Sequence, residues 1–141
     1  PTNGYIASWD ASGDLEDSNL AVAQTPQLNT AKEWTAAQNF NETTLSDGAS
    51  ISWDLEANQV AKVTLGGNRT MAAPTNNNAG AIYVLQVIQD GTGGRTLSWN
   101  AEFLWDPNGA PDLADAAGDV TILVFHDDGT NLRGQKFWNE S

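Results

Sequence analysis

Two stretches of the sequence decide the fold: AIYVLQVIQDGT at residues 81–92 and VTILVFHDDGT at residues 120–130. Each is an apolar run that ends in Asp-Gly-Thr, and each is followed by an arginine and then by an aromatic residue. Asp-Gly between two apolar runs is typical of a β-hairpin, because glycine adopts the positive φ that such turns require. Residues 82–88 are apolar on both faces except at Gln86, so they predict a central strand that is covered on both sides.

The segments before these stretches also have the pattern of strands. Residues 50–55 and 61–65 carry apolar side chains at every second position, as a half-buried strand does. Turns rich in glycine, proline and asparagine separate the segments, and no long amphipathic helix interrupts them. Six to eight short strands of this kind predict an all-β domain, an antiparallel β-sandwich or jelly roll, over residues 38–141.

The first 37 residues differ from the rest of the chain. Their hydrophobic residues are isolated, and no period of 2 or 3.6 persists for more than a turn. Tyr5, Ile6 and Trp9 nevertheless lie close together, although aromatic residues are depleted in disordered segments. We therefore expect residues 1–37 to form an extended N-terminal arm that orders against a neighbouring surface, with Tyr5, Ile6 and Trp9 as its attachment residues.

The composition limits the partners of the chain. Six Lys and Arg residues stand against 18 Asp and Glu residues, which gives 141 residues a formal net charge of −12. Such a surface repels phosphate backbones and anionic lipids, so neither nucleic acid nor a membrane is an expected partner. The chain contains no cysteine, which excludes disulfides and thiolate metal sites. Its six tryptophans are spread along the sequence, which favours core and subunit contacts over a ligand cage.

Three patterns with chemical potential each have a simpler explanation. His126 precedes two aspartates and could act as a base, but no motif for a positioned nucleophile accompanies it. Asp112, Asp115 and Asp119 match the spacing of no calcium loop. The run Gly91–Gly94 is flanked by strands, whereas a phosphate-binding loop leads into a helix. We therefore predict no catalytic residue, no metal site and no cofactor.

Four blocks of the sequence resemble, in the same order, a family of tailed-bacteriophage virion proteins. The blocks are NETTLSDGASISWDL (41–55), VTLGGNRTM (63–71), QDGTGGRTL (89–97) and DGTNL (128–132). The resemblance covers about residues 38–137 and includes head decoration, head-fibre and tail-fibre proteins. It implies a β-sandwich domain, a virion location and a homotrimer.

The resemblance leads to a first hypothesis about function. The chain contains no shaft, collagen-like or coiled-coil repeat, which favours a short capsid-bound protein over a complete tail fibre. We therefore expect a non-enzymatic, trimeric capsid decoration (cement) protein that binds the major capsid protein on the outer surface of the phage head and stabilises it. Trp34, Phe40 and Trp53 are the candidate residues of the subunit interface.

Two other hypotheses remain open. In the first, the chain is a tail-fibre or tail-spike module that binds a host surface glycan, with Trp99 and Trp105 stacking on sugar rings. Tryptophans in an exposed groove would support this hypothesis, and tryptophans buried within the protein would oppose it. In the second, the chain is a hydrolase, which requires two carboxylates about 5–9.5 Å apart. No pattern in the sequence pairs two carboxylates in this way.

Overall fold

The computed structural model describes residues 5–9, 15–21, 37 and 39–140, and the side chains of residues 37 and 39–140. The chain divides into two units, residues 1–38 and residues 39–141. In the first unit, β1 (Tyr5–Trp9) pairs antiparallel with β2 (Leu15–Ala21). Sequence periodicity predicts neither strand, because the hydrophobic residues of this segment do not recur at every second position.

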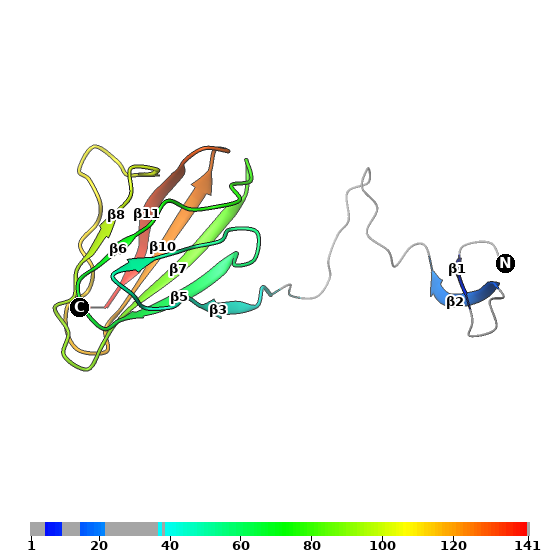
Figure 1. The fold of residues 1–141 in the computed structure, drawn as a ribbon, viewed down its shortest axis with the longest axis horizontal. Coiled ribbons are helices and arrows are strands. Elements are labelled where there is room, and N and C mark those ends of the chain that lie inside the picture. Colours follow the sequence, from blue (N-terminus) through cyan, green and yellow to red (C-terminus); the bar gives the residue numbers. More distant parts are fainter. Residues whose placement is uncertain (1–4, 10–14, 22–36, 38, 141) are drawn as a thin grey trace. The chain divides into compact units, whose positions relative to one another are not determined.

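The described part of the second unit is built from strands and contains no helix. A six-stranded sheet has the order β3-β5-β7-β10-β11-β9, and a three-stranded sheet has the order β4-β6-β8 (Figure 1). The strands are β3 (Glu42–Thr44), β4 (Ser50–Ile51), β5 (Val60–Leu65), β6 (Arg69–Met71), β7 (Ile82–Gln89), β8 (Leu97–Trp99), β9 (Phe103–Leu104), β10 (Val120–Asp127) and β11 (Leu132–Asn139). Within the described residues, no helix is long and apolar enough to cross a membrane.

The strand directions differ from the antiparallel sandwich or jelly roll that the sequence predicts. From β3 to β8 the chain passes alternately between the two sheets, and neighbours within each sheet run parallel. In this part of the unit the chain therefore winds around the core, and each revolution adds one parallel strand to each sheet. Only the pairs of β10 with β7 and with β11 are antiparallel in this unit. The antiparallel prediction is wrong because alternation identifies the buried face of a strand but not its neighbour or its direction.

The two Asp-Gly-Thr sites connect strands in different ways. The second joins β10 to β11 in the predicted hairpin, with Asp127 opposite Leu132. The first is not a hairpin, because after Asp90 the chain crosses to β8 in the other sheet. The buried side chain of Gln89 replaces the missing strand partner: its Oε1 accepts from Arg95 N (2.8 Å), and its Nε2 donates to Arg95 O (2.9 Å).

The core lies between the two sheets and is rich in aromatic residues. Trp53 and Phe125 are fully buried there and pack edge to face, with 5.7 Å between their ring centroids. Buried aliphatic side chains from both sheets complete the core: Ile51, Leu65, Met71, Leu85 and Leu123 are among those with no exposed surface. The odd-numbered residues of β7 and β10 supply the buried face, as the alternation of the sequence predicts.

The other face of β7 and β10 is not covered by the described residues of the second unit. Its residues are half-buried or exposed, and Ile82 keeps 48% of its surface accessible. Within residues 39–140, the prediction that residues 82–88 are covered on both sides is therefore wrong, because the three-stranded sheet packs against only one face of these strands.

Candidate functional site

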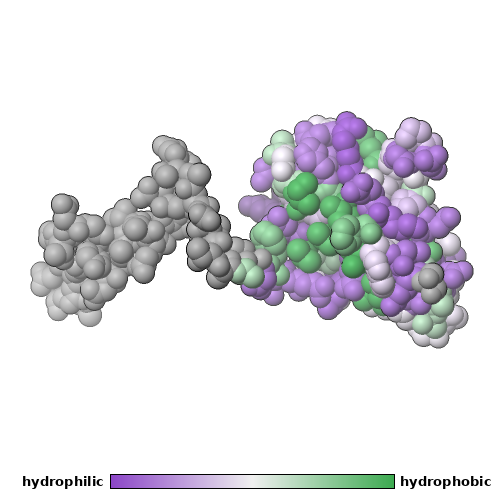
Figure 2. Space-filling model, turned by 180° about the vertical axis from the view of Figure 1, so that it is seen from behind, coloured by the Kyte–Doolittle hydropathy of each residue, from purple (hydrophilic) through white to green (hydrophobic). Residues whose placement is uncertain are grey.

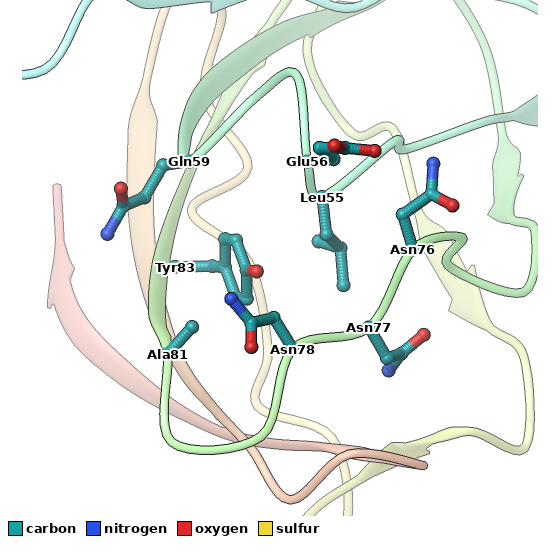
Figure 3. Close-up of a pocket in the computed structure, with 8 residues that line it drawn as sticks. All are labelled: Leu55, Glu56, Gln59, Asn76, Asn77, Asn78, Ala81 and Tyr83. Carbon is teal, nitrogen blue, oxygen red and sulfur yellow. The ribbon is translucent and has the colours of Figure 1, made fainter.

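A pocket of about 470 Å³ opens at the start of β7, between the loops that precede β5 and β7 (Figure 3). Its lining combines an apolar floor, a rim of amide side chains and a single carboxylate. The lining residues are Leu55, Glu56, Gln59, Asn76, Asn77, Asn78, Ala81 and Tyr83. We call this the asparagine pocket.

The floor of the asparagine pocket is formed by Leu55 and Tyr83, which are 2% and 3% exposed. Figure 3 shows both side chains pointing into the space between the two loops, with the Tyr83 hydroxyl turned toward it. Burial, and next the negative charge of Asp127, raise the pKa of Tyr83 above its ordinary value of 10.0. The hydroxyl is therefore neutral at physiological pH and can both donate and accept a hydrogen bond.

A buried carboxylate holds one side of the rim in place. Asp127 has no exposed surface, and its Oδ2 accepts a hydrogen bond from Asn78 N at 2.7 Å. Its Oδ1 accepts from Gly129 N at 2.7 Å and from Asn77 Nδ2 at 3.4 Å. Asp127 therefore links the rim of the pocket to the turn between β10 and β11.

A second carboxylate holds the other side of the rim. Asp54 Oδ1 accepts from Asn76 Nδ2 at 2.8 Å and from Glu56 N at 3.1 Å. The bond from Asn76 is the main cause that lowers the pKa of Asp54 below its ordinary value. Asn76 also has a φ of +58°, and it is the one non-glycine residue with positive φ among the described residues. Asparagine adopts this left-handed conformation more readily than most residues, which suits Asn76 to the turn.

This arrangement suits a ligand that carries many hydroxyl groups. The Asn78 amide and the Glu56 carboxylate remain exposed on the rim. Together they offer donors and acceptors above Leu55 and Tyr83, and the lining as a whole is mainly polar, so a ligand would be held chiefly by hydrogen bonds. Glu56 is the only carboxylate of the lining, so the pocket does not contain the pair that glycoside hydrolysis requires.

The residues predicted to attach the chain and join its subunits lie in different places. Tyr5, Ile6 and Trp9 belong to β1. Trp34 lies outside the described residues. Phe40 precedes β3 and is 59% exposed, so its side chain is available to a partner.

Trp53, the third residue predicted for the subunit interface, is part of the core. It has no exposed surface, and its Nε1 donates a hydrogen bond to Asn58 O at 2.8 Å within its own chain. Its side chain therefore has no surface to offer a second subunit. The sequence could not separate this tryptophan from an interfacial one, because both occur on alternating strands.

The two tryptophans considered for sugar stacking pack against other aromatic rings. Trp99 lies 4.9 Å from Trp105 and 5.1 Å from Phe103, measured between ring centroids, and both tryptophans are half-buried. Trp99 is therefore part of an aromatic cluster rather than a free platform for a sugar. Trp105 borders a second, shallow groove of about 470 Å³ on the six-stranded sheet.

The predicted chemical patterns are separated by the fold. His126 is exposed, whereas the next residue, Asp127, is buried on the opposite face of β10. Among the described residues, no three or more His, Asp or Glu side chains are grouped so that they could hold a metal ion. Asp119 instead supports a turn, because its Oδ2 accepts from Ala116 N at 3.0 Å.

Sequence reasoning missed the residues that form the asparagine pocket. Residues 74–80 have the composition of a loop, and the sequence alone predicts only a connection there. The available signal was the run Asn76–Asn78, since three consecutive amides in a loop are a dense set of donors and acceptors. The position of Asp127 beneath this run depends on a contact between distant parts of the chain, which no local pattern shows.

A protein-family model described as "Putative phage tail fibre C-terminal domain" matches residues 44–132, which is more than half of the chain. The chain is thus a bacteriophage virion protein of mainly β structure. It belongs to the family of phage tail fibre C-terminal domains. Neither the curated proteins nor the solved structures contain a match to it.

Proposed function

We propose that this chain is a non-enzymatic module of a phage tail fibre that binds a glycan of the host surface through the asparagine pocket. The family match favours the tail fibre over the capsid decoration protein of our first hypothesis, because the matched family is named for tail fibres. In this proposal the external partner of the chain is a host glycan, whereas in the first hypothesis it was the major capsid protein.

The observation that carries this proposal is the chemistry of the asparagine pocket. Sugar rings present hydroxyl groups at their edges and C–H groups on their faces. The exposed amide of Asn78 and the carboxylate of Glu56 suit the hydroxyl groups, while the buried side chains of Leu55 and Tyr83 close the bottom of the pocket. Asp54 and Asp127 hold the rim before a ligand arrives, which lowers the entropy cost of binding.

Two earlier expectations accompany the proposal. The self-association of the chain as a homotrimer stays a prediction, as does attachment to the phage particle through Tyr5, Ile6 and Trp9. Both are compatible with a tail-fibre module, because a fibre presents several copies of its receptor-binding site. Several weak sites bind a repetitive polysaccharide far more tightly than one site does.

The proposal is tested with an array of purified bacterial surface polysaccharides and the full chain. Asn78→Ala removes one rim amide from the asparagine pocket but keeps the backbone N–H that Asp127 accepts. Asn108→Ala is the matched control, since Asn108 is also an exposed loop asparagine and its backbone N–H, not its side chain, donates to Asp106 Oδ1 (2.8 Å).

We expect the wild-type chain to bind at least one polysaccharide of the array. Loss of one hydrogen bond at the rim should weaken binding by roughly threefold to tenfold in Asn78→Ala, and Asn108→Ala should bind like the wild type. Equal affinities of both variants would exclude the asparagine pocket as the site. Binding of no polysaccharide by the folded wild-type chain would contradict the proposed function.

A further inference from the structure

The outward face of the six-stranded sheet is the largest feature that the proposed function leaves unexplained. We define this outer face by the outward residues of four neighbouring strands, β5, β7, β10 and β11. They are Val60, Lys62, Thr64, Ile82, Val84, Gln86, Ile88, Val120, Ile122, Val124, His126, Arg133, Gln135 and Trp138. Figure 2 shows apolar residues gathered in the centre of this side of the molecule and hydrophilic residues around them.

We propose that the outer face is the surface through which one copy of this chain associates with a second copy. The asparagine pocket plays no part in the argument, so the two proposals can fail separately.

The first argument is the arrangement of charge. The chain has a formal net charge of −12, so two copies repel each other over most of their surface. The outward residues of these four strands, however, include no aspartate or glutamate, and the carboxylates next to them include those of Glu42 on the neighbouring strand β3 and of Asp106 in the adjoining groove. Its Lys62 pairs with Glu42 and its Arg133 pairs with Asp128, both at the margins of the face. The outer face is therefore where two copies approach with the least electrostatic cost.

The second argument is size. Four strands spaced about 4.8 Å apart, three with eight residues and β5 with six at about 3.3 Å each, cover roughly 480 Å². Two such faces would bury roughly 950 Å² in total, which is close to the smallest area expected of a specific interface between proteins, about 1,000 Å². Trp138, at 45% exposure, and Phe137, at 71%, add large aromatic side chains at one edge. Aromatic residues of this kind are enriched at interfaces.

The experiment compares three forms of the full chain by sedimentation equilibrium. The double variant Ile82→Lys with Val124→Lys places two charges on the central strands of the outer face, one at the start of β7 and one within β10. The control, Thr70→Lys with Ser98→Lys, adds the same charges at exposed, adjacent positions of the three-stranded sheet. Circular dichroism and urea unfolding establish that each form is folded.

We expect the wild type and the control to associate equally. The outer-face variant should dissociate, with a dissociation constant raised by about a hundredfold or more, because lysine ammonium groups would lose water at the contact. A folded outer-face variant that associates like the wild type would overturn the proposal. So would a wild-type chain that stays monomeric at the highest concentration reached, since the face would then serve another partner. If the outer-face variant does not fold, Ile82→Thr alone provides the test at the most exposed apolar position among the outward residues of the central strands.

Discussion

Three glycines in the loop after β7 allow a direct test of how the first Asp-Gly-Thr turn is built. Gly91 meets no atom within 4 Å of an added Cβ and has no positive φ. Gly94 also has free space around it, but its φ is +67°. Gly93 has a φ of +74°, and a Cβ there would lie 2.5 Å from Asp115 O. The three positions separate the cost of backbone conformation from the cost of a steric clash.

Alanine at each position should lower the free energy of unfolding in this order. Gly91→Ala should change it by less than about 0.5 kcal/mol, as surface substitutions do. Gly94→Ala should cost about 1–2 kcal/mol, because only glycine adopts a left-handed conformation freely. Gly93→Ala adds a clash with backbone atoms of Asp115, which cannot rotate away, so its total cost should reach about 2–5 kcal/mol.

The measurement is urea unfolding followed by tryptophan fluorescence, at one protein concentration because self-association would add to the apparent stability. If Gly93→Ala and Gly94→Ala were equally stable within about 0.5 kcal/mol, the loop at Asp115 would have to move away from the new Cβ at little cost. The close packing of that loop on the turn would then not hold the loop in position. A large effect of Gly91→Ala would contradict the assignment of free space at that position.

Three further predictions concern carboxylates and the core. Arg95, the main cause, and two backbone amides lower the pKa of Asp90 to about 2. Because this value lies below the unfolded value of about 3.9, the stabilisation is complete above about pH 4 and is lost as the pH falls toward 2. Asp90→Asn should therefore reduce the pH dependence of stability in that range, measured by urea unfolding at a series of pH values; an unchanged dependence would contradict the role of Asp90. Trp53→Phe removes the hydrogen bond to Asn58 O and leaves a cavity, so thermal and urea unfolding should show a loss of about 1–3 kcal/mol. A stability like that of the wild type would mean that the core closes around the smaller ring. Asp127→Ala leaves the donors of the Asn76–Asn78 rim without their acceptor, and it should weaken polysaccharide binding more than Asn78→Ala does. Equal binding by these two variants would show that the rim holds its shape without Asp127.

Periodicity alone identified the long strands but not their partners. The segments 61–65, 82–88 and 120–125 are strands whose buried faces follow the predicted alternation. Parallel pairing of β5 with β7 could not be predicted, because the choice depends on where the connecting loops leave the sheet. The first Asp-Gly-Thr turn failed as a hairpin signal for a similar reason, since the side chain of Gln89 takes the place of a neighbouring strand.

The candidate site could be predicted only in part. Its amides lie in one run of the sequence, Asn76–Asn78, and local composition could have marked that run as polar and irregular. Its apolar floor and its buried support could not be found in this way. Tyr83 looked like one more apolar residue of a strand, and Asp127 looked like part of a turn next to His126. Their role depends on contacts between residues far apart in the chain, such as the bond from Asn78 N to Asp127.

The apolar pattern of β7 concerns contacts between chains as well as the fold of one chain, and its open face is where this can be seen. Residues 82–88 are apolar on both faces, and this pattern predicts a strand that is covered on both sides. Residues 39–140 cover only the face that carries Leu85 and Val87 and leave Val84 and Ile88 partly exposed. An acidic chain has no reason within its own fold to keep valine and isoleucine at such positions, because polar β-branched threonine would suit an exposed strand as well. The pattern and the structure agree once a second copy supplies the missing cover, which is the arrangement that the outer-face variant tests.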